Sequence, residues 1–423
     1  MRKLLTAVLF SISFIPAFSQ SSSIDSLRNA LAHATADTVK VSILNKLSEA
    51  TMNMDAEKAL SFSNEAVNII AMSVINTGSG IPENLQAETY YQQSRVLQFT
   101  GRFDNAVSSS KMALKLAHDK QLQYKSANIT GNCYFEMGSY PQALEYYYKS
   151  LQLAEQFADK NKTGISMNNI GLVYFSQGNY QKAVECYQKS RQLFAEAGNT
   201  AQSGGAWNNL GQVFSEWNKN DSALKCFSEA EKIFRNSNDN MRLANTLEML
   251  GNAEMNSNSG KAFDHLSEAL KIMGEVNDKN GICSVHTELG KLFLYKYKTW
   301  KGADDLKKAE DHLKQAETIA NQINTIYDLK EIYESFSELY VLKNDYKSAY
   351  NYLKRYQTVN DSLTNETMTQ KIVQMETQYE IDKKQHEMEL LQMKTQLNEL
   401  QLEKTRLQKQ VDANKNNGFN TGH

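Results

Sequence analysis

A pattern of small and aromatic residues recurs every 40 residues in the middle of this chain. Each copy has a small residue, an aromatic residue three positions later, a turn, and then small, aromatic and small residues spaced by four and three. The three clearest copies lie in 131–150, 171–190 and 211–230. Apolar spacings of three and four predict helices, so each copy is expected to form a helix pair. One pair cannot bury both of its apolar faces, so the copies must stack.

Weaker copies extend the pattern in both directions. The small residues at the centres of the expected first helices are Ser48, Ser94, Gly131, Gly171, Gly211, Gly251, Gly290 and Ser337. Most intervals between them are close to 40 residues, but the first is 46 and the last is 47. These two intervals are expected to contain inserted loops, near 76–82 and near 296–302. About eight helix pairs would then cover 38–360.

The pattern resembles the tetratricopeptide repeat in its long-repeat form. This resemblance implies an all-α fold, a right-handed α-solenoid of about eight antiparallel helix pairs. Pro141 would begin a second helix, where its missing N–H costs nothing. Gly138 and Gly178 would end first helices, where a left-handed backbone is needed. With only 3 prolines and 20 glycines in 423 residues, long helices joined by short turns are favoured.

The resemblance also implies that the first helix of each pair lines a concave groove. Polar side chains stand two or three positions before the small residue of these helices. The predicted partner-binding residues are Asn128, Asn168, Asn169, Asn208, Asn209 and Glu248. An amide carries donors and an acceptor, so such a row can pair with the main chain of an extended peptide. Long-repeat members of the family use groove asparagines in this way. The alternative is that asparagine simply suits an exposed helix flank.

Four further polar residues are expected on the same surface by their spacing. They are Asn132, Glu136, Gln212 and Glu216. The surface lacks the paired lysines and arginines that would hold the C-terminal carboxylate of a peptide, which argues against a receptor for chaperone tails.

The first 19 residues predict a signal peptide. Arg2 and Lys3 form a basic start, an apolar stretch runs from Leu4 to Phe14, and small residues precede Gln20. The apolar stretch is too short to cross a bilayer as a permanent helix. We therefore expect an exported protein, periplasmic or secreted, in which 20–37 leads into the solenoid. A retained anchor is the alternative.

After the repeats, residues 361–411 predict a long polar helix. Its apolar residues alternate by three and four, which is the seam of a coiled coil. The seam consists of Leu390, Met393, Leu397, Leu400, Lys404, Leu407 and Val411. This predicts a homodimer through the C-terminal helix, with a single exposed helix as the alternative. Residues 412–423 are expected to form a disordered tail.

The order of these segments resembles the periplasmic sensor half of bacterial repeat-containing histidine kinases and helix-turn-helix regulators. In those proteins the long helix leads into a transmembrane span and an output domain. Neither is apparent in this sequence. The chain is therefore expected to be either a soluble form of that arrangement or a truncated one. A membrane-protein partner would supply the missing parts.

No catalytic, metal or cofactor site is predicted. The seven histidines are scattered, and the sequence contains no HExxH, GxSxG or glycine-rich phosphate motif. The four cysteines form no CxxC pair and are expected to be free and buried. A net charge of -2 offers no basic face for nucleic acid. We expect a non-catalytic scaffold of the bacterial cell envelope that binds a protein or peptide. A sensor ectodomain and an outer-surface assembly factor are the alternatives.

Overall fold

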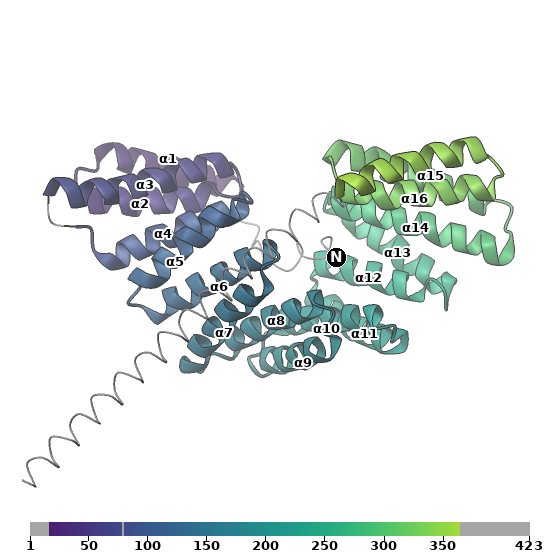
Figure 1. The fold of residues 1–423 in the computed structure, drawn as a ribbon, viewed down its shortest axis with the longest axis horizontal. Coiled ribbons are helices and arrows are strands. Elements are labelled where there is room, and N and C mark those ends of the chain that lie inside the picture. The colour runs from purple at the N-terminus through teal and green to yellow at the C-terminus, as the bar shows by residue number, and fades with distance from the viewer. Residues whose placement is uncertain (1–16, 78–79, 364–423) are drawn as a thin grey trace, which may run out of the picture. The chain divides into compact units, whose positions relative to one another are not determined.

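The structure, a computed structural model, describes residues 17–77 and 80–363, and all regular secondary structure in them is helical (Figure 1). Helix α1 (Ala17–His33) comes first and packs on α2. The first helices of the pairs are α2 (Asp37–Thr51), α4 (Glu83–Phe99), α6 (Lys120–Glu136), α8 (Lys160–Ser176), α10 (Thr200–Glu216), α12 (Asn240–Glu254), α14 (Lys279–Trp300) and α16 (Ile326–Leu342). The second helices are α3 (Ala56–Thr77), α5 (Phe103–Leu116), α7 (Tyr140–Gln156), α9 (Tyr180–Glu196), α11 (Asn220–Ser237), α13 (Ser259–Glu275), α15 (Asp305–Ile323) and the helix over 346–363.

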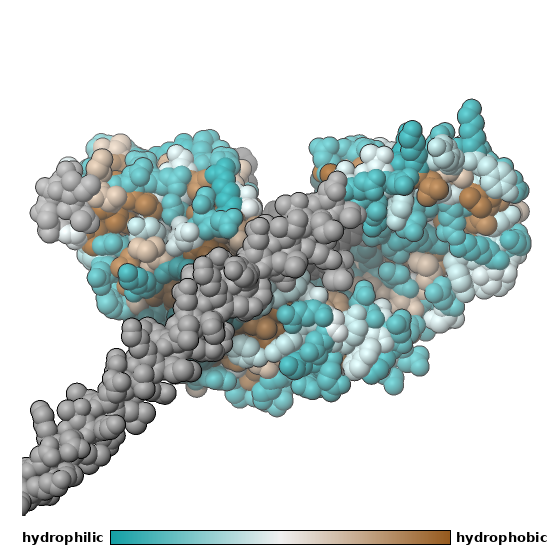
Figure 2. Space-filling view, viewed as in Figure 1, coloured by the Kyte–Doolittle hydropathy of each residue, from teal (hydrophilic) through white to brown (hydrophobic). Residues whose placement is uncertain are grey.

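Each helix packs mainly on the helix before it and the helix after it in the chain, as the colour sequence in Figure 1 shows. Within residues 17–363 the helices therefore form eight consecutive antiparallel pairs, and the predicted all-α solenoid is confirmed. The chain's core is spread along this stack, because each pair buries its apolar faces against its neighbours. The visible surface in Figure 2 is largely hydrophilic, with hydrophobic residues scattered among the polar ones.

Close packing between the two helices of a pair depends on the small residues at the centre of the first helix. A Cβ atom added to Gly131 would lie 2.6 Å from the ring of Tyr147 in α7. Gly171 stands in the same relation to Tyr187, at 3.0 Å. Both tyrosines are only 1% exposed. Glycine at these positions thus allows an aromatic ring to be buried between two helices at full contact.

The ends of the helices agree with the predicted turn residues. Pro141 lies in the first turn of α7. Gly138 and Gly178, after α6 and α8, have φ angles of 73° and 72°. A left-handed backbone of this kind suits glycine, which has no Cβ atom to clash.

The two long repeat intervals, of 46 and 47 residues, contain longer helices, whereas the sequence predicts inserted loops. Helices α3 and α14 each contain 22 residues, whereas α6–α10 contain 17 each. Residues 296–300 continue α14, and the turn begins only at Lys301, which has a φ of 55°. The prediction of a loop over 296–302 was therefore wrong for most of its length. Near 76–82, Asn76 and Thr77 still belong to α3.

All four cysteines are free and buried, as expected. Burial raises the pKa of the Cys133 thiol to about 12, so this side chain behaves as a small apolar group. None of the helices in the described ranges is both long and apolar enough to cross a membrane. The predicted signal peptide lies mainly, and the predicted coiled coil and tail almost wholly, outside the described residues.

Candidate functional site

The orientation of α10 follows from what its side chains touch. A Cβ atom on Gly211 would collide with an aromatic ring of α11, and Leu210 packs in one cluster with Tyr187 of α9. Successive residues are about 100° apart around a helix. Gly205 and Gln212 therefore point away from both second helices. Residues in the same register of α8 point away from α7 and α9.

We call this side of the two helices the inner face. It consists of Ile165, Asn168, Asn169 and Leu172 of α8 with Gly205, Asn208, Asn209 and Gln212 of α10. None of these residues carries a charge. Polar recognition by these eight residues therefore depends on amide groups.

The asparagines of the inner face join successive repeats. Asn169 Nδ2 donates a hydrogen bond to Asn128 Oδ1 of α6, at 2.9 Å. Asn209 Nδ2 donates in the same way to Asn168 Oδ1, at 2.7 Å. One repeat is thus linked to the next by the same amide pair, shifted by 40 residues. We call these four residues, together with Asn208, the amide row.

The amide row continues towards α12 with a change of partner. Asn208 Nδ2 donates to Thr246 Oγ1 at 2.8 Å. Thr246 Oγ1 in turn donates to the carbonyl oxygen of Arg242. Glu248, the last predicted site residue, accepts a hydrogen bond from Ser284 of α14. The structure therefore places each predicted residue at a junction between neighbouring first helices.

Burial distinguishes the amide row from an ordinary exposed helix flank. Asn168, Asn169 and Asn208 are each 8% exposed. Buried amides need hydrogen bonds, and the junctions between repeats supply them. The alternative that asparagine merely suits an exposed flank does not describe these three residues. Whether the row binds a partner stays a prediction.

Part of the hydrogen-bonding capacity in the amide row is unused. Within the described residues, Asn168 Nδ2 donates to no acceptor and Asn209 Oδ1 accepts from no donor. Asn208 Oδ1 is buried and has no partner there either. Asn168 and Asn209 therefore each retain one half of the amide, donor or acceptor, for another molecule, whereas the unused oxygen of Asn208 is buried.

The four additional residues assigned by spacing differ from one another. Asn132 is buried and accepts a hydrogen bond from the Tyr147 hydroxyl at 2.9 Å, so it serves the α6–α7 contact. Gln212 reaches α12, where its Nε2 lies 3.6 Å from Met249 Sδ. Glu136 ends α6 and is partly exposed, and Glu216 is exposed, one turn beyond Gln212.

A charged group replaces the amides at the junction of α14 and α16. Lys291 Nζ lies 2.9 Å from Glu288 and 3.0 Å from Glu331. Glu288 is only 6% exposed. Burial alone lowers the pKa of Lys291, but the attraction of the two carboxylates outweighs it and the pKa is raised. Sequence spacing did not reveal this group, because its three residues come from two helices.

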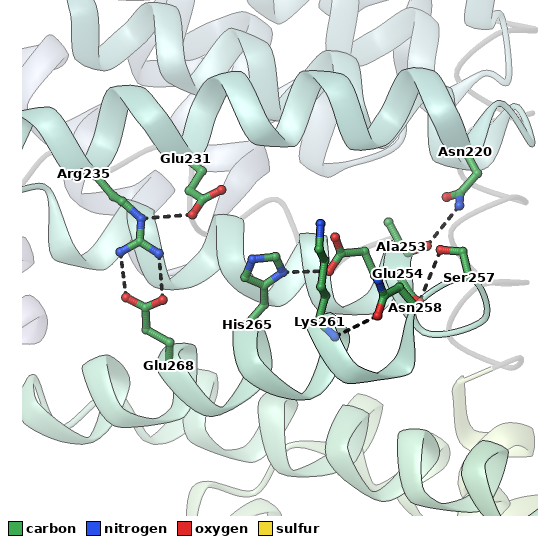
Figure 3. Close-up of polar contacts among 10 residues, drawn as sticks. All are labelled: Asn220, Glu231, Arg235, Ala253, Glu254, Ser257, Asn258, Lys261, His265 and Glu268. Atoms are coloured by element: carbon green, nitrogen blue, oxygen red, sulfur yellow. Dashed lines mark hydrogen bonds and ion pairs between the residues drawn. The ribbon is translucent and has the colours of Figure 1, made fainter. Parts of the chain in front are cut away.

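The second helices are joined by exposed ion pairs. Figure 3 shows Arg235 of α11 donating to both carboxylate oxygens of Glu268 in α13, at 2.7 Å each. Its Nε also donates to Glu231, at 3.0 Å. In the same view His265 Nδ1 lies 2.8 Å from Glu254 of α12. These contacts are chemically unlike the amide row.

Two histidines meet between α14 and α15. The Nδ1 atoms of His286 and His312 lie 3.0 Å apart. Burial, and then the nearby charge of a protonated His312, lowers the pKa of His286 to about 4. Burial also lowers the pKa of His312. In the described part of the chain, no group of three or more histidine, cysteine or acidic residues is placed to hold a metal ion.

Comparisons with known proteins concern the repeats and the fold. Models of the tetratricopeptide repeat match residues 126–196 and 204–237. No curated protein matches the chain by sequence. The matched segments contain α8, most of α10 and the whole amide row.

Several solved structures share the fold. The apo quorum sensor NprR from B. thuringiensis has a TM-score of 0.59 and 12% identity, over 81% of this chain and 99% of its own. Aspartyl phosphate phosphatase F from Bacillus subtilis has a TM-score of 0.54 and 13% identity, over 82% and 96%. The Rap conjugation gene regulator of plasmid pLS20, in complex with the Phr* peptide, has a TM-score of 0.50 and 13% identity, over 84% and 98%. At these identities the likeness concerns the fold alone, which is that of a helical solenoid. The tetratricopeptide repeat is matched in two segments of this solenoid, 126–196 and 204–237.

Proposed function

We propose that this chain is a non-catalytic scaffold that binds a protein or peptide in extended form on its inner face. The observation that carries the proposal is the amide row, in which Asn168 and Asn209 hold each other in place and keep one unused donor and one unused acceptor. An extended peptide offers an N–H and a C=O group at every residue, so it can use both. Because neighbouring repeats already fix the amides, binding costs little side-chain entropy.

The comparison with solved structures supports a peptide as the occupant. The pLS20 regulator, which shares the fold, is in complex with a peptide. NprR is described as a quorum sensor. This second description favours our second candidate function, a periplasmic ligand-binding part of a signal-transduction regulator that works with a separate membrane partner.

Binding is best tested with a library of random twelve-residue peptides displayed on phage. The full chain is used as bait, and the enriched peptide is synthesised with a fluorophore for anisotropy titrations. We expect the double variant Asn168→Ala/Asn209→Ala to bind at least tenfold more weakly, because two hydrogen bonds of about 1 kcal/mol each are lost. Failure to enrich any peptide would contradict the proposed function.

The matched control removes a junction on the other side of the same stack. Arg235→Gln/Glu268→Gln takes away the contact between α11 and α13 and leaves the inner face unchanged. We expect this variant to bind the peptide as the natural chain does. Thermal unfolding of both variants shows whether weaker binding reflects the inner face or a general loss of structure.

The non-catalytic part of the proposal has its own assay. One protein of the same fold is described as an aspartyl phosphate phosphatase. We expect no release of inorganic phosphate from acetyl phosphate, an acyl phosphate like phosphoaspartate. Release that depends on the folded chain would contradict a purely binding function.

We further propose that the chain is exported to the cell envelope and pairs through residues 361–411. Both proposals rest on sequence patterns. Fusing residues 1–30 to a β-lactamase without its own signal should confer ampicillin resistance, and an arginine placed in the middle of the Leu4 to Phe14 stretch should abolish it.

Sedimentation of the mature chain at tens of micromolar tests the pairing through residues 361–411. A strict monomer at this concentration would contradict the pairing.

A further inference from the structure

Helix α10 contains two adjacent glycines, and contacts within the chain explain only one of them. A Cβ atom on Gly204 would lie 2.7 Å from the ring of Phe234, so packing requires glycine there. A Cβ atom on Gly205 would meet nothing within 4 Å. Glycine in the interior of a helix is destabilising relative to alanine, because it loses more backbone freedom on folding. No contact in the described part of the chain offsets this cost at Gly205.

The position of Gly205 places it in the middle of the amide row. Asn209 reaches back to α8 and Asn208 reaches forward to α12. On a helix with about 100° between residues, position 205 falls between the directions of these two side chains. Gly205 therefore leaves the backbone of α10 uncovered between two amides that face opposite neighbours.

The equivalent positions of the adjacent repeats are filled. Ile165 stands one repeat earlier, on α8, and Asn245 stands one repeat later, on α12. Both side chains are partly exposed. The missing side chain is thus a property of α10 alone among these three helices. A ligand can approach the helix axis more closely at this point than at the same register on either side.

We propose that the main chain of the bound peptide crosses α10 at Gly205, with a peptide N–H donating to Asn209 Oδ1 and a peptide C=O accepting from Asn168 Nδ2. This inference rests on the proposed function and specifies the site of main-chain contact. Because the inner face carries no charge, the segment that crosses α10 is recognised through its backbone and has uncharged side chains. Gly205 is a specificity-determining position, because any side chain there occupies the space of the peptide backbone.

Three variants test the role of Gly205 with the peptide enriched from the phage library. We expect Gly205→Leu to weaken binding at least tenfold and Gly205→Ala to weaken it less. Neither should lower the unfolding temperature, since both replace glycine by a better helix former. The control is Gly274→Leu in α13, a second helix, where an added Cβ atom also meets nothing within 4 Å. The control should bind as the natural chain does.

Backbone contact is tested by replacing the amides of the peptide one at a time with esters, each of which removes one N–H donor. We expect one or two positions to lose about tenfold in affinity for the natural chain. The same esters should have little effect on the Asn209→Ala variant, because the acceptor is already absent. A peptide whose affinity depends equally on all its amides would overturn the proposed contact.

The outcomes separate this inference from the proposed function. If Asn168→Ala/Asn209→Ala weakens binding and Gly205→Leu does not, the inner face binds the peptide but the crossing at Gly205 is wrong. If no peptide is enriched, both proposals fail. If Gly205→Leu weakens binding and Gly274→Leu does not, the crossing is supported.

Discussion

The junctions between first helices differ in chemistry along the solenoid. From α6 to α12 they consist of neutral groups, the amide row and Thr246. Between α14 and α16 the junction is Lys291 between two glutamates. Both kinds of junction join equivalent helices. They differ in what remains when one partner is removed, and this difference sets how much stability each junction loses on substitution.

Neutral junctions tolerate change because a lost hydrogen bond costs only about 1 kcal/mol net. A charged junction does not, because removal of one ion leaves the other buried without compensation. A ligand that competes for an amide therefore disturbs the fold little. One that competed for Lys291 would disturb it much more. This argues for placing the partner over α8 and α10.

The largest effect should come from Lys291→Met. This change leaves Glu288 buried beside an apolar group. We therefore expect the free energy of unfolding to fall by about 2 kcal/mol. Urea unfolding followed by circular dichroism measures the loss. The triple variant Lys291→Met/Glu288→Gln/Glu331→Gln should recover most of it. Equal stability of the single variant and the natural chain would contradict a strong charged junction.

Acidification should affect the C-terminal pairs before the middle of the stack. The pKa of His286 is about 4 in the folded chain and close to 6.5 when unfolded, so the unfolded chain gains a proton as the pH falls from 6.5 towards 4. Stability is therefore lost in this window, by on the order of 1 kcal/mol at pH 5. Hydrogen exchange at pH 7 and pH 5 should show faster opening of α14 and α15. In His286→Gln the difference between the two pH values should shrink.

The free energy of unfolding should fall less when one neutral junction is changed. Asn208→Ala removes the hydrogen bond to Thr246, which keeps its own bond to the Arg242 carbonyl. It also removes the unpaired Oδ1 atom, so the loss should be no more than about 1 kcal/mol. Urea unfolding measures it. If Asn208→Ala lowered the free energy of unfolding as much as Lys291→Met does, the two kinds of junction would not differ in stability.

The smallest effect should come from the exposed pair between second helices. Arg235 and Glu268 have side chains that are 41% and 38% exposed. Water and salt screen such pairs, so Glu268→Gln should cost less than about 0.5 kcal/mol. The comparison of unfolding at low and high salt completes the test. A loss above about 1 kcal/mol would show that charge at the second helices matters as much as at the first.

The repeat register was readable from the sequence because packing inside one pair depends on nearby residues. The pattern predicts Gly131 and Gly171 at first-helix centres, and both lie against aromatic rings of the second helices. The starts of the first helices carry a further periodic signal. Each first helix from α6 to α14 begins after a side chain that caps its backbone N–H groups, and these residues are Asp119, Asp159, Asn199, Asp239 and Asp278. Acidic or amide caps at this period mark helix starts directly.

The partners of the candidate site were harder to predict. Sequence spacing placed Asn168 and Asn209 on the same side of their helices. Their mutual hydrogen bond depends on the distance and rotation between repeats, which a periodic pattern does not specify. Gly205 is a sharper case. Its significance lies in the absence of any neighbour, which only the packed structure reveals.

The length of α14 has a consequence for how such arrays change over evolution. Its five additional residues relative to a 17-residue helix add about 7.5 Å at 1.5 Å per residue. They extend the end that carries Trp300, a residue that is 58% exposed, and leave the register of Gly290 against α15 intact. Insertions at this helix end therefore add new surface without disturbing the array. The end of α14 is a natural position for grafting a reporter or a foreign epitope.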